Sequence, residues 1–148
     1  MNIATMVFGK PTMTAKEYRD KVYSKMSEEQ HQEQLIHWLD KHGIYYEVSS
    51  SGVWLPNPHR KGSQAYNLQR NFNLKAMGKM KKTGLNKGQA DIKVYLKDIE
   101  LHIELKAMRG TATPEQLKVQ KIINKTSYAK YEVVKGYLNA IDLVEEHL

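Results

Sequence analysis

The chain has 148 residues, a formal net charge of +7 and a pI near 9.4. This length suits one domain with a single core, and the basic balance favours a polyanionic partner. The absence of cysteine excludes disulfides and thiolate zinc sites. No apolar run approaches the length of a membrane span and no secretory leader is recognisable, so we expect no membrane partner and a cytoplasmic location.

Two capping boxes predict helices in the first part of the chain. Thr14-Ala15-Lys16-Glu17 opens a short amphipathic helix whose apolar residues recur every four positions, at Tyr18, Val22 and Met26. We expect this helix to pack on the core or on a second subunit and to carry no chemistry. Ser27-Glu28-Glu29-Gln30 opens the next helix, which should stop at Gly43 and bury Leu35, Ile36 and Leu39.

Acidic residues cluster in the first turns of this second helix. Helical spacing of three and four residues places Glu29, Gln32, Glu33 and Ile36 on one face. Acids in a first turn also interact favourably with the helix dipole, which needs no further function. Both interpretations of these acids therefore stay open at this point.

A basic segment follows the strand predicted at residues 44–48 and a loop at 49–62. Trp54 in this loop either anchors it or offers a ring on which a base stacks. A helix is predicted over residues 65–80. From residue 60 to residue 87 the chain contains no acid, which suits a phosphate backbone, although a solvated basic face is the alternative. The candidate nucleic-acid contacts are Arg60, Lys61, Arg70, Lys75, Lys79, Lys81, Lys82 and Lys87.

Residues 88–106 are predicted to form two strands joined by a tight turn at Lys97-Asp98. Because side chains alternate along a strand, Glu104 and Lys106 share one face and Ile103 and Leu105 the other. Antiparallel pairing of the two strands would bring Asp91 near Glu104. Two neighbouring carboxylates repel each other unless a cation lies between them, so the hairpin predicts a metal site.

A third cap, Thr113-Pro114-Glu115-Gln116, opens a helix that should run to about Asn124. Gln116 either closes the capping box or reaches the predicted metal site, and both roles are compatible. A strand at residues 131–134 and a helix from about residue 138 complete the chain. This order of elements predicts an α/β fold with a mixed central sheet flanked by helices.

The motifs of the second half together resemble the PD-(D/E)xK nuclease core. Within that superfamily they resemble the virus-type replication-repair nuclease (VRR-NUC) family, in the four motifs Gly88-Gln89-Ala90-Asp91, Ile103-Glu104-Leu105-Lys106, Gly110 and Thr113-Pro114-Glu115-Gln116. The family usually has proline where this chain has Ala90, which changes the turn but removes no catalytic group. The resemblance implies a restriction-endonuclease-like core at residues 27–148, preceded by an extension at 1–26.

The predicted centre binds Mg²⁺, for which Mn²⁺ can substitute, because its oxygen ligands are hard. Asp91 and Glu104 would hold one or two ions, with the backbone carbonyl of Leu105 as an extra ligand. Lys106 would orient the attacking water or stabilise the transition state. By resemblance, Glu29 adds a helix-borne acid, with Glu33 as the alternative, and Gln116 reaches the site.

The resemblance implies an endonuclease that cuts branched DNA or Holliday junctions in replication, repair or recombination. It further implies a phage-type, single-domain homodimer, located in the host cytoplasm if phage-encoded. The alternative from another class is a non-catalytic, basic nucleic-acid-binding module. In that case Glu104 and Lys106 form an ordinary exposed salt bridge, which stabilises by only ~0–1 kcal/mol. Asp91 discriminates the two, because a binder needs no second acid beside Glu104.

Overall fold

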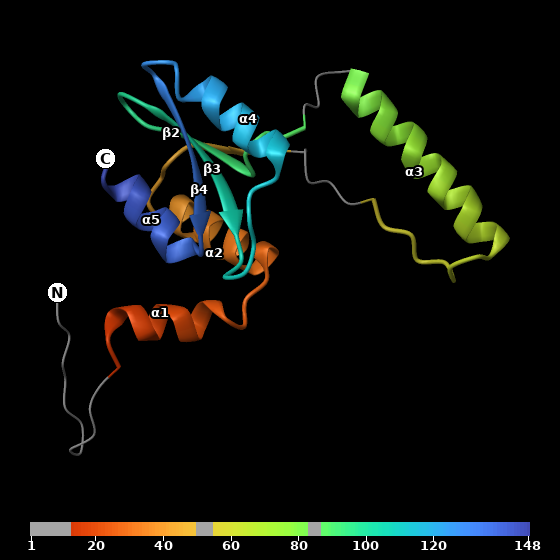
Figure 1. Ribbon diagram of the computed structural model, residues 1–148, viewed down its shortest axis with the longest axis horizontal. Helices are drawn as coiled ribbons and strands as arrows, with labels where there is room; N and C mark the ends of the chain where they lie inside the picture. The colour runs from red at the N-terminus through yellow and green to blue at the C-terminus, as the bar shows by residue number, and fades with distance from the viewer. Residues whose placement is uncertain (1–12, 50–54, 83–86) are drawn as a thin grey trace.

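The computed structural model describes residues 13–49, 55–82 and 87–148 (Figure 1). Trp54 lies outside these residues. The elements are, in order, α1 (Ala15–Tyr23), α2 (Glu28–Lys41), β1 (Tyr46–Val48), α3 (Gln64–Lys82), β2 (Ile92–Tyr95), β3 (Glu100–Lys106), α4 (Pro114–Ile123), β4 (Ala129–Lys135) and α5 (Tyr137–Glu145). All three predicted capping boxes are present, at Thr14, Ser27 and Thr113.

The strands form one four-stranded sheet in the order β1-β2-β3-β4. β1 pairs antiparallel with β2 and β2 antiparallel with β3, whereas β3 and β4 run parallel. The central hairpin places Ile92 opposite Ile103 and Tyr95 opposite Glu100. The predicted mixed sheet and the predicted antiparallel hairpin are both confirmed.

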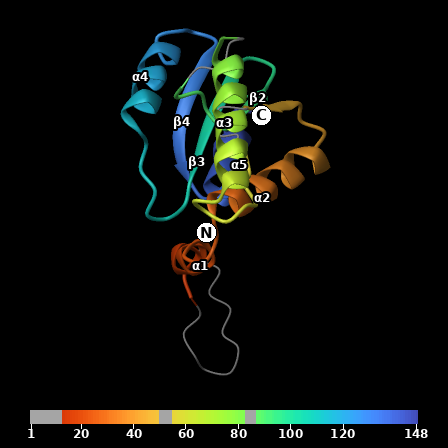
Figure 2. The same cartoon turned by 90° about the vertical axis from the view of Figure 1, so that its right-hand side faces the viewer.

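One face of the sheet carries the hydrophobic core, which α2 and α5 cover (Figure 2). Alternate residues of β2 and β3 point into it, as strand periodicity requires. The core comprises Leu35, Leu39, Ile92, Val94, Leu101, Ile103, Leu105, Ala140, Ile141 and Val144. The opposite face therefore receives the residues between them, including Glu104 and Lys106.

Helix α4 covers the β4 end of that opposite face. Asn124, at its C-cap, accepts a hydrogen bond from the Tyr131 backbone N–H at 2.7 Å and donates to the Tyr131 carbonyl at 3.2 Å. Gln120 donates to the same carbonyl. These bonds hold α4 against β4 and bring its N-terminus beside β3.

Helix α1 is attached to the core by Tyr23. This ring is 3% exposed, while Tyr18, predicted to be on the packing face, is 58% exposed. The Tyr23 ring lies edge-on to His31 and to Tyr137. The packing face is thus rotated from the predicted one, because Tyr23 finds aromatic partners on α2 and α5. This contact with the core is one of the two packing arrangements expected for the helix.

Helix α3 stands apart from the sheet (Figure 1). None of its residues is buried, and the apolar side chains of Leu68, Phe72 and Leu74 are 65%, 66% and 58% exposed. It contacts the preceding loop, where the Asn73 amide donates to the Leu55 carbonyl at 3.0 Å. The helix was predicted from sequence, but its separation from the core was not.

Candidate active site

The β2–β3 hairpin brings Asp91 and Glu104 into one cavity. Asp91 directly precedes β2, and the pairing of Ile92 with Ile103 places it beside the next residue of β3, Glu104. The Leu105 backbone N–H donates to Asp91 Oδ2 at 2.8 Å, which orients that carboxylate. In this structure Leu105 contributes its N–H, and a role for its carbonyl as a ligand stays a prediction.

Glu104 and Lys106 form a buried ion pair. Lys106 Nζ lies 2.7 Å from Glu104 Oε1, and the two residues are only 7% and 2% exposed. The binding-module alternative predicts an exposed ion pair, which has little effect on the free energy of folding. Burying two charges is expensive, so a pair of this kind is weak evidence for a purely stabilising role.

The side chain of Gln116 closes its capping box and also reaches Glu104. Its Oε1 accepts from the Thr113 backbone N–H at 2.7 Å and so closes the capping box of α4. Its Nε2 donates to Glu104 Oε1. Because the cap fixes the side chain, Gln116 can hold Glu104 in one orientation.

The carboxylates have unusual proton affinities. Burial, together with the charge of Asp91, raises the pKa of Glu104 to about 7, while Lys106 opposes the shift. Burial also raises the pKa of Asp91, against the hydrogen bond from Leu105. Burial lowers the pKa of Lys106, but its contact with Glu104 outweighs this and leaves the pKa above its usual value. Perturbed groups gathered in one cavity are typical of functional sites.

The helix-borne acid at this cavity is Glu28. Glu28 lines the cavity, and its Oε1 lies 3.9 Å from Lys106 Nζ. Glu29 and Glu33, the predicted candidates, are exposed and do not line it. The physical reason is helical phase: the inward stripe of α2 runs through His31, Leu35 and Leu39. Counting back three residues from His31 on this stripe reaches Glu28, which is the signal that the sequence interpretation missed.

The cavity has a volume of about 380 Å³ and is open to solvent on one side. Most of its lining is polar: Glu28, Lys87, Gly88, Gln89, Asp91, Glu104, Lys106, Thr113, Glu115 and Gln116. Of the eight predicted nucleic-acid contacts only Lys87 is among these residues. Arg60 and Lys61 precede α3, and the others lie on α3 itself.

Gly88 fits a position that other residues cannot occupy without strain. Its φ is +85°, and a Cβ there would lie 2.5 Å from the Glu115 carbonyl oxygen. We expect Gly88→Ala to destabilise the protein by about 1–3 kcal/mol in urea unfolding. Gly43→Ala is the matched control: Gly43 also has a positive φ, of +65°, but nothing within 4 Å of its Cβ position. Equal losses in the two variants would show that the contact with α4 does not matter.

The donor set fits a divalent cation. Glu104 Oε2 is buried and has no hydrogen-bond partner, which is costly unless a proton or a cation satisfies it. No group of three or more His, Asp or Glu side chains within the described ranges already converges as a metal site. Mg²⁺, however, is commonly held by one or two carboxylates together with waters and substrate phosphates. Asp91 and Glu104 would hold such an ion, with Glu28 at the mouth of the cavity.

The structure is a mixed four-stranded sheet flanked by helices, with an acid before one strand and Glu-x-Lys on the next. A solved structure described as a VRR_NUC domain protein has this fold: it matches with a TM-score of 0.58 over 83% of this chain and 88% of that chain, at 20% identity. No protein-family model and no curated protein sequence matches the chain. The fold is therefore VRR-NUC-like. Among the described helices, none is sufficiently long and apolar to span a membrane.

Proposed function

We propose that this protein is a metal-dependent nuclease that hydrolyses phosphodiester bonds in DNA. One observation carries the proposal: Asp91 and Glu104 share a polar, solvent-accessible cavity in which Lys106 contacts Glu104. The net charge of +7 and the VRR-NUC-like fold support a nucleic-acid substrate. A basic binding module would have no use for the buried carboxylate of Glu104, with that of Asp91 beside it, on a surface that binds phosphates.

Each residue of the cavity has a separate role in the proposed reaction. A bound Mg²⁺ or Mn²⁺ would lower the pKa of a water and neutralise charge on the scissile phosphate. Lys106 donates hydrogen bonds from its ammonium, either to the attacking water or to a phosphate oxygen. Gln116 keeps Glu104 in place. Lys87, at the rim, offers the entering backbone a positive charge.

The first experiment compares labelled four-way junction, flap, duplex and single-stranded DNA with Mg²⁺, Mn²⁺ and EDTA. We expect cutting only with a divalent ion, fastest on branched DNA. Binding without cutting under every condition would instead establish the non-catalytic module. Cutting that persists in EDTA would contradict the role given to the carboxylates.

We propose in addition that the protein acts as a homodimer on branched DNA in replication, repair or recombination, in the cytoplasm of the cell in which it is made. Cutting two strands of a junction requires two active sites at a set separation. The exposed apolar residues of α3, Leu68 and Phe72, are four residues apart and so lie on one side of the helix. A self-complementary contact between two such helices would bury both stripes, as two-fold dimers do.

We expect Phe72→Glu to shift the protein from dimer to monomer in light scattering, because a carboxylate in an apolar contact is not solvated. Asn71→Glu is the matched control, since Asn71 is the exposed neighbour of Phe72 on α3. If both variants keep the mass of the wild type, α3 is not the dimer contact. A monomeric wild-type protein would remove the dimer from the proposal altogether.

A further inference from the structure

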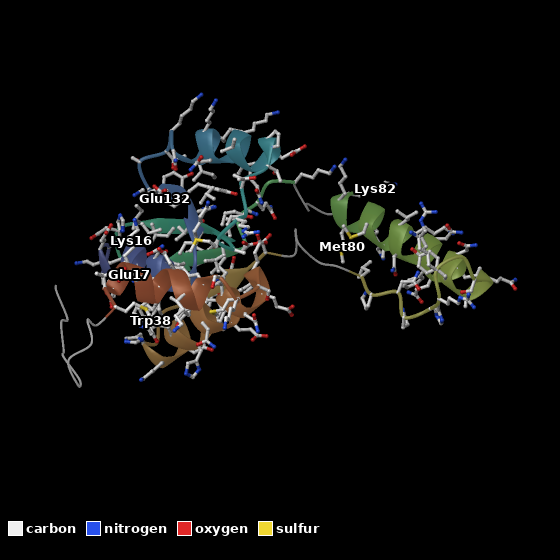
Figure 3. All side chains as sticks on the ribbon, turned by 60° about the horizontal axis from the view of Figure 1, so that its bottom comes forward. Lys16, Glu17, Trp38, Met80, Lys82 and Glu132 are labelled. Carbon is white, nitrogen blue, oxygen red and sulfur yellow. The ribbon has the colours of Figure 1, made fainter. Side chains whose placement is uncertain are left out.

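A second cavity, of about 440 Å³, lies between α1 and the junction of β4 with α5. It does not share a lining residue with the active-site cavity. Its lining combines charged, polar and apolar residues from four parts of the chain: Ala15, Lys16, Arg19, Asp20, Tyr23, Met108, Lys135 and Asn139. Figure 3 shows Lys16 on the side of the body away from Lys82 of α3.

The walls of this cavity are fixed by specific contacts. Arg19 donates to Asp142 at 2.6 Å and to Asn139 at 2.8 Å, which ties α1 to α5. The Tyr23 hydroxyl accepts a hydrogen bond from the Asn139 backbone N–H at 3.2 Å. A Cβ on Gly136 would lie 2.4 Å from the Tyr23 ring, so only glycine permits this approach. The cavity is therefore a built part of the fold.

Two of its cations are exposed at the surface. Arg19 is neutralised by Asp142, whereas Lys16 and Lys135 lie in exposed positions and form no ion pair within the described residues. Asp20 also lines the cavity, and its negative charge reduces the net positive charge there. Flexible lysines at the edge of an open cavity suit a compact anion that needs charge and no directional recognition, such as a backbone phosphate.

The cavity adjoins the active site through the sheet. Lys135 is the ladder partner of Lys106 on the neighbouring parallel strand, and paired residues of adjacent strands lie ~5 Å apart. The Gly136 N–H donates to the Lys106 carbonyl at 3.1 Å. Met108 lines the second cavity, while Gly110 lies against Glu28 of the first. The two cavities thus lie on either side of the segment that follows β3.

We refer to this second cavity, with Lys16 and Lys135 at its edge, as the α1 cleft. We propose that the α1 cleft binds a backbone phosphate of the DNA whose scissile phosphate occupies the active-site cavity. The inference rests on the proposed function. It assigns a role to the N-terminal extension: α1 forms the outer wall of a substrate track that continues past Lys106. The contact is independent of sequence, because phosphates carry no base identity.

The test uses the double variant Lys16→Ala/Lys135→Ala and the matched control Lys21→Ala/Lys125→Ala. Lys21 is on α1 and Lys125 follows α4, both are exposed, and neither lines the cleft. Each double variant removes the same charge. Glu104→Gln is present in all proteins so that DNA is not cut, and fluorescence anisotropy with labelled duplex and four-way junction is measured across a series of salt concentrations.

We expect the cleft variant to bind DNA roughly tenfold more weakly at low salt, with the slope of log K against log salt reduced by about 1, because one backbone phosphate is no longer neutralised. The control should keep nearly the wild-type slope. Equal slopes for both double variants would overturn the inference. The inference would also be overturned if inorganic phosphate binds the cleft while neither double variant changes the affinity for DNA. That result would identify a site for small anions.

Failure of the proposed function has a different signature. If the protein with Glu104 intact cuts no DNA but the cleft variant still loses affinity and slope, the nuclease assignment fails and the phosphate cleft stands. If the intact protein cuts DNA and the cleft variant, with Glu104 restored, has an unchanged KM and salt dependence, the nuclease stands and the cleft fails. A protein that binds no DNA at all overturns both.

Discussion

Glu104→Gln is expected to reduce DNA cutting by roughly 10³-fold, the loss that follows when a key electrostatic contact of a phosphoryl-transfer site is removed. The substitution keeps the volume of the side chain and removes its negative charge. Glutamine can still accept from Lys106 and Gln116 through its carbonyl oxygen, so the fold should persist. The measurement is the single-turnover rate on the best of the four DNA substrates, with saturating Mg²⁺.

Glu145→Gln is the control for this experiment, because Glu145 is exposed near the end of α5 and far in sequence from the cavity. It makes the same chemical change and should leave the rate within twofold. Circular dichroism and urea unfolding verify that Glu104→Gln is folded. A folded variant that cuts at the wild-type rate would remove Glu104 from the chemistry and with it the proposed metal centre.

The contribution of Glu104 to the stability of the metal-free protein should fall by about 3 kcal/mol as the pH rises from 4.5 to 8. Burial raises the pKa of Glu104 from 4.5 to about 7, so in this range the folded state keeps a proton that the unfolded chain has released. The stabilisation is complete below pH 4.5 and lost as the pH passes 7. Each tenfold difference in proton affinity is worth ~1.4 kcal/mol, so this shift of the Glu104 pKa corresponds to about 3 kcal/mol of stability.

Comparison with Glu104→Gln isolates this contribution in urea unfolding. Burial lowers the pKa of His31 and of His102, and these groups act in the opposite direction, costing stability as the pH falls below 6.5. Both histidines remain in the variant, so the difference between the two proteins reports Glu104. A difference that does not change between pH 4.5 and pH 8 would show that Glu104 is not held protonated in the folded state.

Mg²⁺ should stabilise the wild type more at pH 8 than at pH 5. A cation binds a carboxylate that has lost its proton, and binding to the folded state alone raises the free energy of unfolding. Thermal unfolding with and without Mg²⁺ measures this without any DNA. Glu104→Gln should show little dependence on Mg²⁺ at either pH. The same Mg²⁺ effect in wild type and variant would locate the cation elsewhere.

Local patterns in the sequence determined much of this structure. Capping residues act within one helical turn, so all three boxes, and the start of each helix that they open, could be predicted. Strand alternation is equally local, and it placed Glu104 and Lys106 on the face opposite Ile103 and Leu105. The close pairing of Asp91 with the second strand followed from the short connection of a hairpin.

Other features of the structure could not be predicted from the sequence, because they depend on contacts between distant segments. Glu28 rather than Glu29 lines the cavity, because the packing of His31 and Leu35 sets the rotation of α2 against the sheet. Tyr23 rather than Tyr18 is buried, since its partners come from α2 and α5. The separation of α3 and the cleft beside Lys135 likewise have no local signal. Periodicity defines which residues share a face, whereas the partner that covers each face is chosen by the whole chain.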